Sequence, residues 1–274
     1  MTAFTNHFSF EFRTGIRNRT LLMMNYLFPL GFYLLLGFVM PEINPLFLET
    51  MIPAMVVFAI LAATLLGLPD PLVTAREAGI FRSFKINEVP STSILSIPAM
   101  TTSLHLVIVT VIITFSAPLL FDAPLPVNWS GYVLTFIVTT FACAGIGVLI
   151  GVISSSTRST VLWSQLIFLP SMLLGGLMLP YGMLPDAVQK VAQLLPTTHA
   201  MNAFNGLAMG NVSDLSPWMS IIILFFGGIL ALGLAIYLFS WDSQNTTRRG
   251  NLLLALLAWL PYVVGLVLTT ILII

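Results

Sequence analysis

Charge is the scarcest property of this sequence. Only 7% of its 274 residues are Asp, Glu, Lys or Arg, whereas 58% are hydrophobic and the mean hydropathy is +1.01. A water-soluble domain carries about 25% charged residues, because its surface faces water. The chain has too few charges to cover a soluble globule of its size, so its exterior must face lipid. We therefore expect an all-α integral membrane protein.

Sequence motifs for nucleotide binding, catalysis and metal binding are absent as well. The chain has no Gly-x-x-x-x-Gly-Lys-[Ser/Thr] loop for ATP phosphates, no His-Glu-x-x-His and no Gly-x-Ser-Gly. We therefore expect no enzymatic activity, no metal site and no cofactor bound by this chain. The single cysteine, Cys143, rules out an intrachain disulfide. Zero net charge with scattered basic clusters gives no sign of a nucleic-acid partner.

Long uncharged stretches predict seven membrane-spanning helices. A helix needs about 20 mostly apolar residues to cross a hydrocarbon core of about 30 Å. The predicted spans are 20–40, 50–69, 94–120, 129–154, 160–179, 217–240 and 251–273. An eighth uncharged stretch, 191–213, holds too many polar residues to face lipid.

Basic residues beside these spans predict their orientation. If the spans alternate in direction, nine of the ten basic residues fall on the same side as the N-terminus, and Lys190 is the exception. We therefore expect a multi-pass protein of the cytoplasmic membrane with its N-terminus in the cytoplasm. The first 19 residues lack an apolar core, so we expect no cleaved signal peptide.

Residues 1–19 combine aromatic and basic side chains just before the first span. Phe4, Phe8 and Phe12 alternate with polar residues, and Arg13 and Arg17 follow. This composition favours a helix lying in the cytoplasmic interface of the membrane. The alternative is a disordered tail.

The cytoplasmic connection, residues 70–93, is longer than a helix–helix turn needs. Thr74 followed by Glu77 has the spacing of a capping box, which predicts the start of a short helix. Ile80, Phe81 and Phe84 then share one apolar face of that helix, which we expect to be exposed. Charged residues at its other positions are Arg76, Glu77, Arg82, Lys85 and Glu88. Two interpretations remain: a helix on the membrane surface, or a docking element for a soluble partner.

The external connection, residues 180–216, is also long. Prolines predict a helix from Pro185 to Leu195 that Pro196 ends, and a second short element to Gly210. We expect a hairpin that dips into the outer leaflet, because polar backbone is tolerated there when protein or water surrounds it.

Two spans carry polar side chains that need partners. His105, in the third span, could relay protons or form a hydrogen bond between packed helices near Thr101, Thr102 and Ser103; we favour the second. In the fifth span the amide of Gln165 seeks either another helix or a substrate. The residues of that possible substrate cavity are Gln165, Phe168 and Met172.

At the two long connections the chain resembles the permease family of type-2 ABC exporters. Arg76-Glu77-Ala78-Gly79 is similar to that family's coupling helix, and Leu184-Pro185, Leu195-Pro196-Thr197-Thr198 and Gly206 to Gly210 to its Pro-punctuated external stretch. The resemblance covers roughly residues 5–240 and implies a six-helix core over 20–240. It implies an ATPase-coupling role for Thr74, Arg76, Glu77, Gly79, Ile80, Phe81, Arg82 and Phe84, and an external hairpin marked by Pro185, Pro196, Thr197 and His199. The additional apolar segment, 251–274, departs from the family.

The resemblance further implies the partners and the activity. We expect a separate cytoplasmic ATPase that holds ATP and Mg²⁺, a second permease copy or a paralogue, and export by alternating access. Sparse charge in the spans suggests a hydrophobic or amphipathic substrate, such as a drug, an antibiotic, a lipid-like molecule or a lipopeptide. The alternatives are a gradient-driven exporter and a membrane assembly factor that transports nothing.

Overall fold

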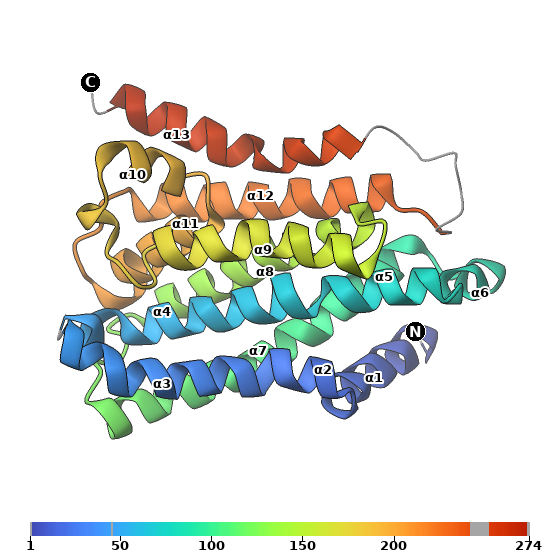
Figure 1. Ribbon diagram of the computed structural model, residues 1–274, viewed down its shortest axis with the longest axis horizontal. Coiled ribbons are helices and arrows are strands. Elements are labelled where there is room, and N and C mark those ends of the chain that lie inside the picture. Colours follow the sequence, from blue (N-terminus) through green and yellow to red (C-terminus); the bar gives the residue numbers. More distant parts are fainter. Residues whose placement is uncertain (1, 45, 242–251, 273–274) are drawn as a thin grey trace.

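The computed structural model describes residues 2–44, 46–241 and 252–272, and every regular element in these ranges is a helix. Most of the helices run side by side along the long axis of the molecule (Figure 1). The all-α prediction is confirmed.

Six helical stretches in the described residues are long and apolar enough to cross a membrane. They are Arg19–Ile43, Phe47–Glu77, Ser91–Phe121, Trp129–Ile153, Pro217–Leu238 and Leu253–Thr270. The first comprises α2 (Arg19–Leu22), η1 (Met23–Leu27) and α3 (Phe28–Ile43), and the second α4 (Phe47–Leu61), η2 (Ala62–Gly67) and α5 (Pro69–Glu77). The next three are α7 (Ser91–Phe121), α8 (Trp129–Ile153) and α12 (Pro217–Leu238), and the last lies within η5 (Leu252–Trp259) and α13 (Leu260–Leu272).

The helix α9 (Thr157–Leu174) takes the place of the fifth predicted span but is not among these six. It packs against η2 and α5 of the second span and against α8. It is shorter than predicted, because the chain turns at Gly175 and Gly176, and Gly176 adopts a positive φ of 85°. Its apolar character is also reduced by Arg158, Gln165 and five serine and threonine residues.

The second span forms the centre of the bundle. In its apolar window 94% of the residues are buried inside the protein. Phe58 stacks on Phe32 with ring centroids 4.0 Å apart. A Cβ atom added to Gly147 of α8 would lie 2.1 Å from the carbonyl oxygen of Thr64, so only glycine lets these backbones approach so closely.

Basic side chains gather at one end of the bundle. The helices α1 (Thr2–Arg17), α5 and α6 (Ile80–Ile86) lie at this α6 end, as does the start of α9 (Figure 1). All the described basic residues except Lys190 belong to these elements or to the start of α2. Lys190 lies in α10 (Asp186–Ala192), which lies at the opposite, hairpin end together with η3 (Tyr181–Met183) and α11 (Pro196–Ala203). The same-side placement of basic residues is thus confirmed for the described part of the chain.

The two terminal helices pack against the bundle. α1 contacts α7, and Asn18 separates α1 from the first span by capping α2 through a bond from Thr20 N to its Oδ1 (2.9 Å). The location of α1 in a membrane interface stays a prediction. At the other terminus Tyr262 is fully buried against Gly227 of α12. Pro261 lies in the first turn of α13, where the 3₁₀ helix η5 gives way to the α-helix.

Candidate functional site

The cytoplasmic connection folds differently from its prediction. The second span continues as α5 to Glu77, so Thr74 lies inside a helix and caps nothing. The helix ends near Gly79, whose φ of 74° is left-handed, and the short α6 follows. The predicted capping box is therefore wrong. Charged residues indicate where a segment can no longer lie in the hydrocarbon core, but a helix can continue through them.

Arg76 is buried, with 5% of its surface exposed, although the sequence suggested an exposed charge. Its Nη1 donates to Val152 O at 2.9 Å and its Nη2 donates to Ser154 O. These carbonyls lie at the C-terminal end of α8, where the last four C=O groups lack intrahelical partners and a cation is favourable. Arg76 therefore ties α5 to α8.

The apolar face of α6 is divided between the bundle and solvent. Phe81 is only 4% exposed and packs against Phe239, with ring centroids 5.4 Å apart. The expectation that Phe81 is exposed is wrong. Ile80 and Ile86 are 45% and 82% exposed. Thr74, Glu77 and Arg82 are exposed, and Phe84 is half-buried. Their coupling role stays a prediction.

His105 is buried between helices. Its Nδ1 lies 2.6 Å from the hydroxyl of Tyr26, on the first span, and its ring stacks on Phe12 of α1 at 4.4 Å. The prediction of a histidine hydrogen-bonded between packed helices is confirmed. Its partner is a tyrosine 79 residues away rather than the neighbouring Thr101, Thr102 or Ser103.

The three residues of the possible substrate cavity lie along α9. Phe168 is buried and contacts Phe58 of α4 at 6.0 Å. Gln165 and Met172 are half-buried. None of the three lines either of the two pockets reported below. Their contact with a substrate stays a prediction.

The external hairpin is inserted into the bundle. All eight residues of α11 are buried, and Pro196 starts this helix. His199 Nε2 donates to Gln193 O at 2.8 Å, which fixes the neutral tautomer and leaves Nδ1 to accept from Ser220 Oγ at 3.3 Å. Burial lowers the pKa of His199 to about 4, and the bond to the Gln193 carbonyl opposes this in part. Two short helices form where Pro185 and Pro196 predicted them, and the insertion of the hairpin into the outer leaflet stays a prediction.

A second set of bonds holds the hairpin to its flanking segments. Asn202 Nδ2 donates to Leu215 O and to Ser220 Oγ, at 2.9 and 3.0 Å, and Asn202 Oδ1 accepts from Leu215 N at 3.0 Å. Thr269 Oγ1, on α13, donates to Gln193 Oε1 at 2.7 Å. The additional C-terminal helix therefore braces the hairpin.

The four residues predicted to mark the hairpin have different surroundings. Pro185 precedes α10 and is exposed, whereas Pro196, Thr197 and His199 are buried. A Cβ atom on Gly175 would lie 2.1 Å from Thr197 Oγ1, which shows how closely α11 approaches the end of α9. These residues position the hairpin.

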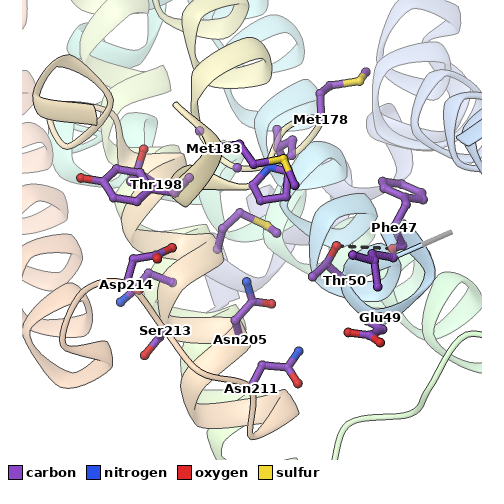
Figure 2. A pocket seen from close by; sticks show the side chains of 18 of the residues that line it. Phe47, Glu49, Thr50, Met178, Met183, Thr198, Asn205, Asn211, Ser213 and Asp214 are labelled. Carbon is purple, nitrogen blue, oxygen red and sulfur yellow. Dashed lines mark hydrogen bonds between the residues drawn. The ribbon is translucent and has the colours of Figure 1, made fainter. Parts of the chain in front are cut away.

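A pocket of about 440 Å³ opens at the hairpin end, between α4, the chain after α9, and the hairpin (Figure 2). Glu49 and Asp214 lie on different sides of it, with Asn205 and Asn211 between them. The pocket therefore offers carboxylate and amide groups to a polar molecule. Sequence reasoning missed these four residues; the acids in the external loops were visible, but nothing showed that the loops would meet.

The comparisons with known proteins agree with this architecture. A family model described as "ABC-2 type transporter" matches residues 3–209. A protein of Bacillus subtilis (strain 168), provisionally named transport permease YvfS, is 24% identical over 233 residues, which cover 83% of this chain and 93% of the relative. No solved structure matches the chain. The family match spans more than half of the chain, and the chain belongs to the ABC-2 type transporter family, whose members are transport permeases rather than enzymes.

Proposed function

We propose that this chain is the membrane-spanning subunit of an ATP-driven exporter, whose ATPase is a separate polypeptide bound at the α6 end. The surface of α6 carries the proposal. Ile80 and Ile86 are exposed beside Arg82 and Lys85, on a turn that Phe81 anchors in the bundle. Apolar anchors with a charged rim are typical of protein-binding surfaces. Membership of an ABC transporter family supports an ATPase as the partner.

The orientation follows from charge. Basic residues favour the cytoplasmic side of short membrane loops, and those described here gather at the α6 end. This end and the N-terminus are therefore cytoplasmic in our proposal, and the hairpin end faces outward. The ATPase meets α6 from the cytoplasm, and two copies, or one copy and a paralogue, complete the transporter.

The substrate class is a hydrophobic or amphipathic molecule, moved by alternating access. Its support is the apolar character of the spans, which contain few groups that could pair with a charge. The polar pocket at the hairpin end then lies on the outward side of the path.

A gradient-driven exporter is the second candidate. Such transporters use ionisable groups inside the membrane. His105 is such a group, but its ring is held by Tyr26 and Phe12 rather than by an acid. This surrounding favours a packing role.

Transport by inside-out vesicles separates the two candidates. The chain is produced together with a cytoplasmic P-loop ATPase of the ABC type, and uptake of a hydrophobic dye such as Hoechst 33342 is measured. We expect uptake to require hydrolysable ATP, to survive an uncoupler, and to stay within a few-fold of wild type in His105→Asn. Uptake that an uncoupler abolishes while ATP remains would favour the gradient-driven exporter.

A further inference from the structure

A second pocket lies inside the α6 end, away from the hairpin. It has a volume of about 370 Å³ and is enclosed by α1, the start of the first span, α5, α6 and α7. Small-molecule sites occupy about 300–1,000 Å³, so a compact ligand fits. The walls are mostly apolar, with Leu72, Phe81, Phe84, Ile94 and Pro98 among them.

Two residues that line this pocket carry a buried side-chain atom without a hydrogen-bond partner among the described residues: Asn25 Oδ1 and His105 Nε2. Asn25 lines the pocket and is 2% exposed, and its Oδ1 makes no hydrogen bond to any residue that the structure describes. A buried acceptor without a partner costs about 1–3 kcal/mol. Asn25 also lies in the π-helical turn η1, a distortion that is frequent at functional sites.

Two neighbouring polar side chains already make a hydrogen bond, although His105 bonds through Nδ1 alone and its Nε2 makes none. Thr101 Oγ1 donates to Pro98 O at 3.0 Å, and His105 Nδ1 lies 2.6 Å from the Tyr26 hydroxyl. The stack of Phe12 on His105 places α1 against the third span beside the pocket. When the Tyr26 hydroxyl donates to His105 Nδ1, His105 Nε2 carries the ring proton and is a donor, so Asn25 Oδ1 is the acceptor that a ligand hydroxyl in this pocket would satisfy.

We propose that this pocket binds a small uncharged amphiphile, whose hydroxyl donates to Asn25 Oδ1 and whose hydrocarbon body lies between α5, α6 and α7. An uncharged ligand fits because a buried charge needs a counter-charge: no Lys or Arg lines the pocket to pair with an anion, and Glu11 of α1, the single charged residue among those lining it, already has an interaction partner. The bound molecule contacts Phe81 and Phe84 and thereby touches the turn that we assign to ATPase binding. The proposal itself stands whether or not that assignment holds.

Photolabelling of the full chain in lipid nanodiscs tests this site. The probe is a diazirine derivative of octan-1-ol, and adducts are located by mass spectrometry. We expect adducts on Leu72, Phe81 and Phe84 that excess octan-1-ol displaces. The methyl ether 1-methoxyoctane, which has a similar body but no donor, should compete about fivefold less well, the loss of about one hydrogen bond.

Two variants separate recognition from folding. Asn25→Leu removes the acceptor and should make the alcohol and the ether compete equally. Ala75→Phe keeps Asn25 but fills the pocket at its α5 wall, and should abolish these adducts. Ser116→Ala, which removes a polar group bonded to Tyr33 outside the pocket, should change nothing. Equal competition by the ether in the wild type, or undiminished pocket adducts in Ala75→Phe, would overturn the proposal and leave a pocket occupied by water or lipid chains.

Discussion

The two long connections of this protein are built on opposite principles. The hairpin at 180–216 buries an entire helix, α11, and fixes it with bonds to α12 and α13. The turn at 78–90 buries Phe81 but leaves Ile86 82% exposed. The buried hairpin helix α11 contributes to the stability of the fold. The helix α6 packs against the bundle on one side only, so its exposed side is available to bind a partner. This contrast teaches which connection to alter for stability and which for binding.

The largest expected effect concerns the anchor of α6. Phe81→Ala removes a buried ring that packs against Phe239, and such truncations cost about 3–5 kcal/mol. We expect the midpoint of thermal unfolding in detergent to fall by roughly 10 °C. Ile86→Ala, on the same helix, is the matched control and should shift it by less than about 2 °C. Equal shifts for the two variants would contradict the division of α6 into a buried and an exposed side.

The next effect concerns the hairpin. Asn202→Ala deletes three hydrogen bonds and leaves Leu215 N without its partner, so we expect a loss of about 2–3 kcal/mol. The same thermal assay should show a fall of roughly 6 °C. Asn211→Ala is the control, because Asn211 is an exposed residue of the same pocket. An unchanged midpoint for Asn202→Ala would mean that the hairpin is not held by these bonds.

The pH dependence of stability tests the hydrogen bonds of the hairpin at His199, with a smaller expected effect. His199 has a folded pKa of about 4, below the usual value near 6.5, so the unfolded chain binds its proton first as pH falls. This contribution to stability is complete above about pH 6.5 and is lost between there and about pH 4. At pH 5 the loss is about 2 kcal/mol.

Unfolding midpoints of the wild type and of His199→Gln, measured from pH 7.5 to pH 5, check this expectation. The wild type should lose more stability than the variant over this interval, because the variant has no group that titrates at this position. Parallel curves would show that the pKa of His199 is the same in the folded and the unfolded chain, which contradicts its burial as a neutral ring.

The sequence predicted six of its seven spans correctly, because a lipid-facing helix needs a long apolar run, a property of single segments. It also predicted the hairpin, since Pro185 and Pro196 constrain the backbone locally. It misplaced the second span's end, because Gly79 and not a charge stops that helix. It could not show whether Phe81 faces protein or solvent, and it could not pair His105 with Tyr26. These outcomes depend on contacts between distant segments.

The smallest effect on the fold, and the sharpest test of the comparison, concerns Ile86. Its side chain is 82% exposed, so Ile86→Asp should change stability by no more than about 0.5 kcal/mol. If α6 binds the ATPase, the same change places a carboxylate in an apolar contact and should cost about 2 kcal/mol or more of binding, roughly a thirtyfold loss of affinity. Retention of the ATPase on the purified chain and the permease-dependent ATPase rate are the measurements. Lys190→Asp, an exposed charge reversal at the hairpin end, is the control and should retain the ATPase. If the Ile86→Asp variant retains the ATPase normally and has a normal unfolding midpoint, the docking surface lies elsewhere. The proposal that α6 binds a partner would then be wrong.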